Sequence, residues 1–235
     1  MSNLFNHNEF NPLYDLPTKD VTGMRFYQLP CGIFLPSVTT VINYGEKPWL
    51  EEWRNMLGKK KADKEQQRCA DRGTAVHLMC ERFLKNETAS QICDGQTREN
   101  IKLFNQIKFA LKGHVDNIRL QENVLWSELL GIAGRCDLIA DYDGTVSIID
   151  FKTSNKLKDE EKIEHYFVQC TAYALMVEEL YGVQVNNIVV VITTESGLMP
   201  QVFKQPVSKY IMLLQQSIKT FYAKEQTTIK RINQL

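Results

Sequence analysis

The chain has 235 residues, and its 28 Lys and Arg balance 28 Asp and Glu, so its formal net charge is zero. Hydrophobic residues make up 43% of the chain and charged residues 24%. This composition excludes a disordered chain, a collagen-like repeat and a histone-like polycation. This length predicts one domain, or one domain with a sizeable appendage. A net charge of zero still allows a local basic groove for nucleic acid.

The six cysteines lie too far apart for a zinc or redox motif, because no two are within ten residues of each other. The first eleven residues are polar and lack arginine, unlike a signal or transit peptide. The longest apolar run, 188–192, is far shorter than the ~20 residues that span a bilayer. We therefore expect a cytoplasmic protein with free thiols and no membrane contact, from a bacterium or a phage-infected host cell.

The N-terminal half predicts loops followed by helices. Residues 1–36 contain four prolines and predict an extension with a short hairpin at about 25–34. Ser37 is a candidate N-cap for a short helix, while Pro48 and Gly58 have the positions typical of a helix start and stop. Apolar spacing predicts two further helices, over about 61–84 and 98–112.

From about residue 118, β-type residues replace the helical pattern. Asp143-Gly144 predicts a tight turn between strands at about 137–142 and 145–153. The remaining pattern predicts a helix at 159–180, a buried strand at 187–194, an edge strand at 201–204 and a helix from 208. This order predicts an α/β (α+β) fold whose single structural domain comprises an extension (1–36), a helical lobe (37–115) and a core (116–235).

The predicted hairpin brings two carboxylates and an ammonium group together. Asp150 and Lys152 lie two apart on a strand, so their side chains leave the same face. Counting outward from the turn places Asp137 beside Asp150, and two adjacent carboxylates repel each other unless a cation such as Mg²⁺ or Mn²⁺ joins them. Gly131 and Gly134 precede Asp137, where a backbone can approach a ligand closely. The alternative is a surface hairpin with an ordinary ion pair.

Two predicted helices add polar residues at helical spacing. Gly73, His77 and Glu81 share one face, and the glycine predicts close approach of another group to that face. Gln169 and Tyr173 form a similar pair on an otherwise apolar helix. The alternatives are a structural histidine and a hydrogen-bond network within the core.

In this order, the motifs resemble those of PD-(D/E)XK nucleases of the RecB type. The resemblance rests on Gly73-x3-His77-x3-Glu81, Gly134-x2-Asp137, Asp150-Phe-Lys152-Thr-Ser and Gln169-x3-Tyr173. Pro36-Ser-Val-Thr-Thr, with Trp49 and Trp53, is also similar to phage exonucleases and mitochondrial genome maintenance exonucleases. The resemblance spans roughly residues 36–180. It implies a restriction-endonuclease-like core, with a mixed central sheet flanked by helices, that hydrolyses DNA phosphodiesters.

The resemblance also implies roles for individual residues. The implied ligands of one or two Mg²⁺ or Mn²⁺ ions are Asp137, Asp150, His77 and the backbone carbonyl of Phe151. Lys152 resembles the lysine beside the attacking water, where it acts either as a base or as a stabiliser of negative charge. Further supporting or DNA-contacting residues are Gln169, Tyr173, Glu81 and Glu128.

Other features narrow the expected cofactors. Some relatives hold an iron–sulfur cluster with one upstream and three C-terminal cysteines, but Cys170 is the last cysteine here, so we expect no such cluster. The absence of G-x4-G-K-[ST] predicts no use of ATP.

The resemblance favours a metal-dependent exonuclease that acts on free single-stranded DNA ends in replication, recombination or repair, with an unidentified protein partner. The alternatives are a structure-specific endonuclease or resolvase, and a non-catalytic DNA-binding scaffold. A large helical lobe could cover the site and admit a threaded single strand. Candidate stacking residues are Trp49, Trp53, Phe83 and Phe104, of which the two phenylalanines also fit a helix core. Candidate contacts to the DNA backbone are Lys59, Lys60, Lys61, Arg68 and Arg72, and the alternative for the lysine run at 59–61 is an ordinary solvated face.

Overall fold

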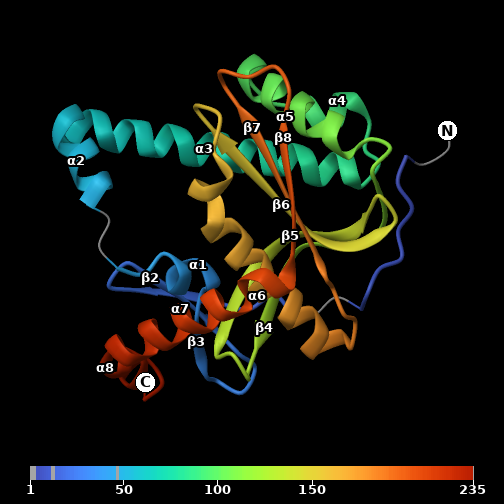
Figure 1. Cartoon of the computed structure of the whole chain (residues 1–235). Coiled ribbons are helices and arrows are strands. Elements are labelled where there is room, and N and C mark those ends of the chain that lie inside the picture. The colour runs from blue at the N-terminus through green and yellow to red at the C-terminus, as the bar shows by residue number, and fades with distance from the viewer. Residues whose placement is uncertain (1–3, 12–13, 46–47, 235) are drawn as a thin grey trace.

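The computed structural model describes residues 4–11, 14–45 and 48–234. Its centre is a mixed five-stranded sheet in the order β4-β5-β6-β7-β8 (Figure 1). The strands are β4 (Val115–Ser127), β5 (Ile132–Tyr142), β6 (Thr145–Ser154), β7 (Asn187–Thr194) and β8 (Gln201–Pro206). Only the β6–β7 pair is parallel. The buried strand at 187–194 and the edge strand after it lie where the sequence predicted them.

A small antiparallel sheet precedes the core: β1 (Thr18–Val21), β2 (Met24–Gln28) and β3 (Phe34–Pro36). The predicted hairpin is therefore the β2–β3 pair, and β1 adds a third strand. Ser37 caps α1 (Val38–Ile42), because its hydroxyl accepts a hydrogen bond of 3.0 Å from the backbone N–H of Thr40.

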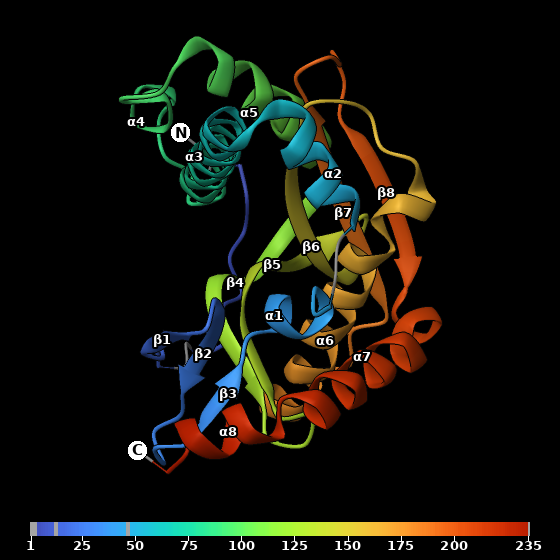
Figure 2. The same cartoon turned by 90° about the vertical axis from the view of Figure 1, so that its left-hand side faces the viewer.

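Helices α3 (Lys59–Leu84) and α5 (Arg98–Leu111) cover one face of the large sheet (Figure 2). Apolar residues of both helices share a core with Leu138, Ile149 and Phe151 of the sheet. Two shorter helices flank α3, namely α2 (Pro48–Leu57) before it and α4 (Ala89–Cys93) after it. The sequence pattern did not predict α4, which is only five residues long and depends on a capping box between Thr88 and Gln91.

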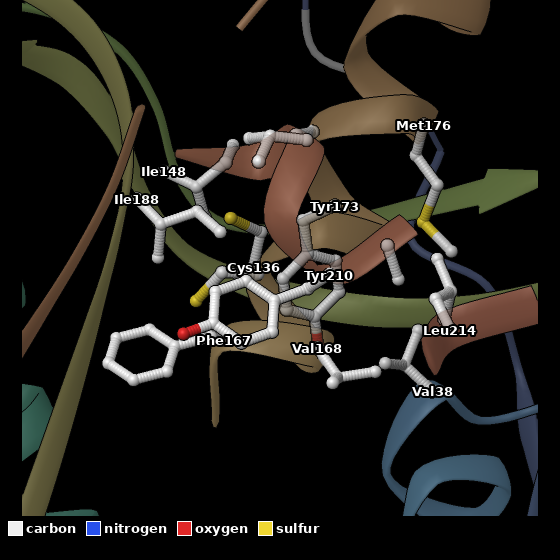
Figure 3. Packing of buried hydrophobic residues seen from close by; sticks show 14 of the residues in the cluster. Val38, Cys136, Ile148, Phe167, Val168, Tyr173, Met176, Ile188, Tyr210 and Leu214 are labelled. Carbon is white, nitrogen blue, oxygen red and sulfur yellow. The ribbon is translucent and has the colours of Figure 1, made fainter. Parts of the chain in front are cut away.

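The opposite face of the sheet is covered by α6 (Glu164–Tyr181), which follows a 3₁₀ turn (Glu160–Ile163). Figure 3 shows Phe167 and Tyr173 of α6 beside Cys136, Ile148 and other buried residues of this layer. The predicted final helix is divided into a 3₁₀ turn (Val207–Tyr210), α7 (Ile211–Lys224) and α8 (Gln226–Ile232).

These layers confirm the predicted mixed sheet flanked by helices. The division into extension, lobe and core stays a prediction. Among the described residues, no helix combines the length and the apolar character needed to cross a bilayer.

Candidate active site

The hairpin of β5 and β6 has the predicted tight turn. Asp143 and Gly144 both have positive φ angles, 50° and 77°, which is the backbone of a type I′ turn. Pairing continues outward as far as Leu138 and Ile149. Beyond that pair, β5 continues beside β4 and β6 beside β7. The next residues on the two strands are Asp137 and Asp150, so both acids lie where the hairpin strands separate.

Separation of the strands frees backbone groups of Phe151, and candidate site residues bind them. The Phe151 N–H donates to Oδ2 of Asp137 over 2.8 Å. The Phe151 carbonyl accepts a hydrogen bond from Nε2 of His77, also over 2.8 Å. Because a carbonyl can only accept, Nε2 carries the proton and Nδ1 faces away from Phe151. The predicted metal-binding carbonyl thus lies at the cluster, where it already holds His77.

Asp150 and Lys152 leave the same face of β6, as strand parity predicted. The Lys152 ammonium lies 2.6 Å from Oδ1 and 2.5 Å from Oδ2 of Asp150. Burial raises the pKa of Asp150 to about 6, against the opposing charge of Lys152. Burial alone would lower the pKa of Lys152, but the charges of Asp150 and Asp137 raise it above its ordinary value. Lys152 therefore remains an ammonium ion at neutral pH.

His77 reaches two carboxylates from the side of the sheet that α3 covers. Its Nδ1 lies 3.5 Å from Oε1 of Glu122 and 3.7 Å from Oδ2 of Asp137. Burial lowers the pKa of His77, but Asp137 and Glu122 outweigh it and raise the pKa to about 9. In the absence of metal, the imidazolium therefore balances the negative charge of the two acids.

Glu122 is the site residue that the sequence analysis missed. The β4–β5 register pairs Gln121 with Leu138 and Asn123 with Cys136, which puts Glu122 opposite Asp137. Glu122 has a positive φ of 51°, unusual for a residue with a side chain. Counting outward from the turn at 128–131 would have identified it, but that turn carries only one glycine as a signal.

Glu128 does not join the cluster around Asp137, and its expected DNA-contacting role stays a prediction. It is exposed in the turn after β4, where its N–H donates to Oε1 of Glu179 over 3.0 Å. Six residues of strand separate it from Glu122, a distance of about 20 Å. The acid beside Asp137 is therefore Glu122, because the antiparallel register determines which residues become neighbours.

Gln169 and Tyr173 of α6 lie on the Asp150 side of the sheet. Gln169 donates from Nε2 to Oδ1 of Asp150 over 3.3 Å, and its supporting role in the site stays a prediction. Tyr173 is buried and packs against Gly134, where an added Cβ would lie 2.9 Å from the tyrosine oxygen. Similarly, a Cβ on Gly131 would lie 2.7 Å from the oxygen of Tyr222. Both glycines therefore accommodate aromatic residues of the protein, which corrects the expectation that they admit a ligand.

Gly73, His77 and Glu81 line one open cavity of about 470 Å³ together with Glu122. An added Cβ on Gly73 would meet only Thr153, at 3.9 Å, so packing within the protein does not require glycine there. Glu81 lies at the cavity, but its carboxylate pairs with Lys85 at 2.6 Å. The described residues thus supply no internal partner that approaches the helix closely at Gly73.

Of the other candidate nucleic-acid contacts, some are exposed to solvent and others are buried or ion-paired within the protein. Trp49 is exposed and Trp53 half-buried, whereas Phe83 and Phe104 are buried and pack edge to face in the core. Burial removes the two phenylalanines as stacking surfaces. Lys59, Lys60 and Lys61 are exposed, while Arg68 and Arg72 both bind Glu195.

The donor set at the cluster fits a divalent metal ion. One ligand atom each from His77, Glu122 and Asp137 lies within 4.8 Å of the other two. Two ligands at about 2.1 Å from one ion are at most about 4.2 Å apart, and the two distances from His77 Nδ1 fall inside that limit. Carboxylate oxygens suit Mg²⁺, and the imidazole nitrogen adds affinity for Mn²⁺. Asp150 lies beside this group and is paired with Lys152.

Comparisons with solved structures gave distant similarities. Rai1 from Scheffersomyces stipitis, in complex with (3'-NADP)+ and a calcium ion, is 17% identical with a TM-score of 0.32; the match covers 75% of this chain and 46% of the Rai1 chain. SSO0001 is 18% identical with a TM-score of 0.28, covering 62% of this chain and 74% of SSO0001. This chain therefore spans about half the length of the Rai1 chain. A comparison with curated proteins gave no match.

The sequence profile of the PD-(D/E)XK nuclease superfamily matches residues 50–233. That range is most of the chain, and it contains the cluster of His77, Glu122 and Asp137 as well as the Asp150–Lys152 pair. Nucleases of this superfamily use divalent metal ions, for which this cluster offers ligands. On this match, the chain belongs to the PD-(D/E)XK nuclease superfamily.

Proposed function

We propose that this protein is a Mg²⁺- or Mn²⁺-dependent DNA exonuclease of the RecB type that acts on free single-stranded ends. The observation that carries the proposal is the convergence of His77, Glu122 and Asp137 beside the Asp150–Lys152 pair. A scaffold protein has no need for three clustered acids, since their repulsion costs stability. A nuclease uses them to concentrate positive charge where phosphate reacts.

In this proposal, Glu122, Asp137 and His77 Nδ1 hold the metal, and Asp150 is the neighbouring carboxylate. The bound ion supplies positive charge that neutralises the phosphate oxygens and acidifies water. Hydrolysis adds negative charge to an already anionic phosphate. The two acids on the strands and the imidazole are held by backbone groups and by the sheet register, so they need little rearrangement.

Lys152 is proposed to stabilise the negative charge that develops during hydrolysis. Its pKa is raised by Asp150 and Asp137, so it is a cation at neutral pH and has no lone pair with which to accept a proton. This supports an electrostatic role over a general-base role. Gln169 orients Asp150, and Asp150 in turn orients the ammonium group.

We propose a role in DNA replication, recombination or repair in the cytoplasm of a bacterium or a phage-infected host. The proposed reaction needs neither ATP nor an iron–sulfur cluster. The six cysteines are free thiols, of which Cys80, Cys136 and Cys170 are buried. A protein partner from the same process would bring the enzyme to its DNA ends.

The test is purified protein with Mg²⁺ on end-labelled linear single-stranded DNA, beside the same strand closed into a circle. We expect degradation of the linear strand and survival of the circle, because a threaded strand needs a free end. Equal cleavage of both would replace the exonuclease proposal with the endonuclease alternative. No cleavage of either, with metal present, would contradict a nuclease function.

A further inference from the structure

A second cavity lies next to the candidate active site, between α2, α3 and the loop that follows β6. Its volume is about 690 Å³, and Tyr166 of α6 forms part of its wall. The Lys152 ammonium lies 5.1 Å from the centre of the Tyr166 ring. Tyr166 therefore contacts both this cavity and the Lys152 ammonium group. Figure 1 shows α2 beside the end of α3 where that helix begins.

Three aromatic side chains line the cavity: Trp49, Trp53 and Tyr166. Trp49 is 67% exposed, and Trp53 and Tyr166 are partly exposed. Clusters of large exposed aromatic residues are uncommon on surfaces that bind nothing, because removing their apolar surface from water is favourable. A planar apolar ligand is the partner that several aromatic faces accommodate best.

The same cavity also carries unpaired positive charge. Lys156 and Lys158 line it, and within the described chain neither ammonium group forms an ion pair or a hydrogen bond. Arg72 is different, because its side chain is only 6% exposed and donates to Thr153, Asn155 and Glu195. The hydrogen bonds of Arg72 thus fix the position of residues around the cavity, while Lys156 and Lys158 remain available to bind an anion.

From this combination we infer that the cavity binds an unpaired nucleobase of the DNA strand, with a neighbouring phosphate at Lys156 and Lys158. The inference rests on the proposed nuclease function, which it deepens by giving a reason for single-strand preference. A base in a duplex is already stacked and paired, so only a single-stranded nucleotide can enter. The base would lie beside Tyr166, whose ring also faces the Lys152 ammonium.

The experiment uses the full chain carrying Asp150→Asn in Mg²⁺ and measures its affinity for two DNA strands that carry the same charge. One strand is octathymidylate and the other has eight abasic deoxyribose phosphates. We expect the strand with bases to bind at least about fivefold more tightly. Trp49→Ala and Trp53→Phe should reduce that preference, while Lys156→Ala and Lys158→Ala should weaken both strands to the same degree.

Phe109→Ala is the matched control, because Phe109 is also an exposed aromatic residue but lies on α5 outside this cavity. It should keep the full preference, and thermal melting should show that each variant folds. Equal binding of the two strands, or a preference that survives both tryptophan variants, would overturn the inference, and the two tryptophans would then only pack α2 against α3. If the wild-type protein cleaves DNA but the two strands bind equally well, the inference about the cavity fails and the nuclease proposal stands. Base preference without any cleavage supports the cavity and contradicts the nuclease.

Discussion

Asp137 and His77 are held by the two backbone groups of one residue, with Asp137 on the N–H of Phe151 and His77 on its carbonyl. The side chains meet with Nδ1 of His77 3.7 Å from Oδ2 of Asp137. Asp137 is on β5, and His77 is on α3, which packs against the sheet. Their distance therefore depends on how α3 packs on the sheet.

Glu122→Gln should reduce cleavage by at least about tenfold and raise the Mg²⁺ concentration needed for half-maximal activity. The amide keeps the shape of the side chain but removes the charge that faces His77. Cleavage rates across a Mg²⁺ titration measure this. Glu128→Gln is the control, and it should behave as wild type because Glu128 is exposed about 20 Å away. Equal effects of the two variants would contradict the assignment of Glu122.

Asp150→Asn should abolish detectable cleavage and lower the melting temperature by several degrees. The substitution leaves the Lys152 ammonium without its carboxylate in a largely buried position, and an unpaired buried charge is costly. Thermal melting in EDTA separates this effect from metal binding. An increase in melting temperature would mean that repulsion between Asp137 and Asp150 outweighs the ion pair.

Lys152→Ala should lower kcat by roughly 10²-fold or more with little change in DNA affinity. A cation that stabilises the transition state contributes to rate more than to ground-state binding. Lys204→Ala serves as the control, since Lys204 pairs with Asp143 at the far end of the hairpin. Loss of DNA affinity at unchanged kcat would make Lys152 a phosphate contact.

His77→Ala should strongly reduce activity in Mg²⁺, and Mn²⁺ should restore part of it. The variant loses one ligand of the cluster but keeps both carboxylates, and Mn²⁺ binds nitrogen and oxygen sites more tightly than Mg²⁺. Parallel assays with the two metals provide the measurement. Unchanged Mg²⁺ kinetics would assign His77 a structural role on the Phe151 carbonyl.

The stability of the metal-free protein should fall as pH rises from about 6.5 to 9. The pKa of His77 is about 9 in the folded protein, above its ordinary value, so the folded state binds more protons than the unfolded state in this range. The stabilisation is complete below the unfolded pKa and is lost as the pH passes the folded one. Urea unfolding in EDTA at several pH values measures the slope. His77→Gln should flatten it, and a wild-type slope in that variant would attribute the effect to another group.

The sequence alone determined the chemistry of the hairpin. A type I′ turn at Asp143-Gly144 sets the pairing of its two strands, and the two-residue period of a strand sets which side chains share a face. Both are local rules, so Asp137, Asp150 and Lys152 could be placed together without knowledge of the rest of the chain. The helical spacing of Gln169 and Tyr173 is equally local, and it placed both residues on the face of α6 that lies against the sheet.

The structure was needed to decide which third acid joins the site, because the turn at 128–131 carries too weak a signal to set the β4–β5 register from the sequence. Glu122 reaches Asp137 through the β4–β5 register, and Glu128 is excluded by the same register. Only the packing of α3 on the opposite face brings His77 there, and no local signal encodes the contact of two elements separated by over forty residues. The same is true of Gly134, whose neighbour is Tyr173 of α6. Local periodicity specifies faces, whereas burial of those faces against one another specifies the distances on which chemistry depends.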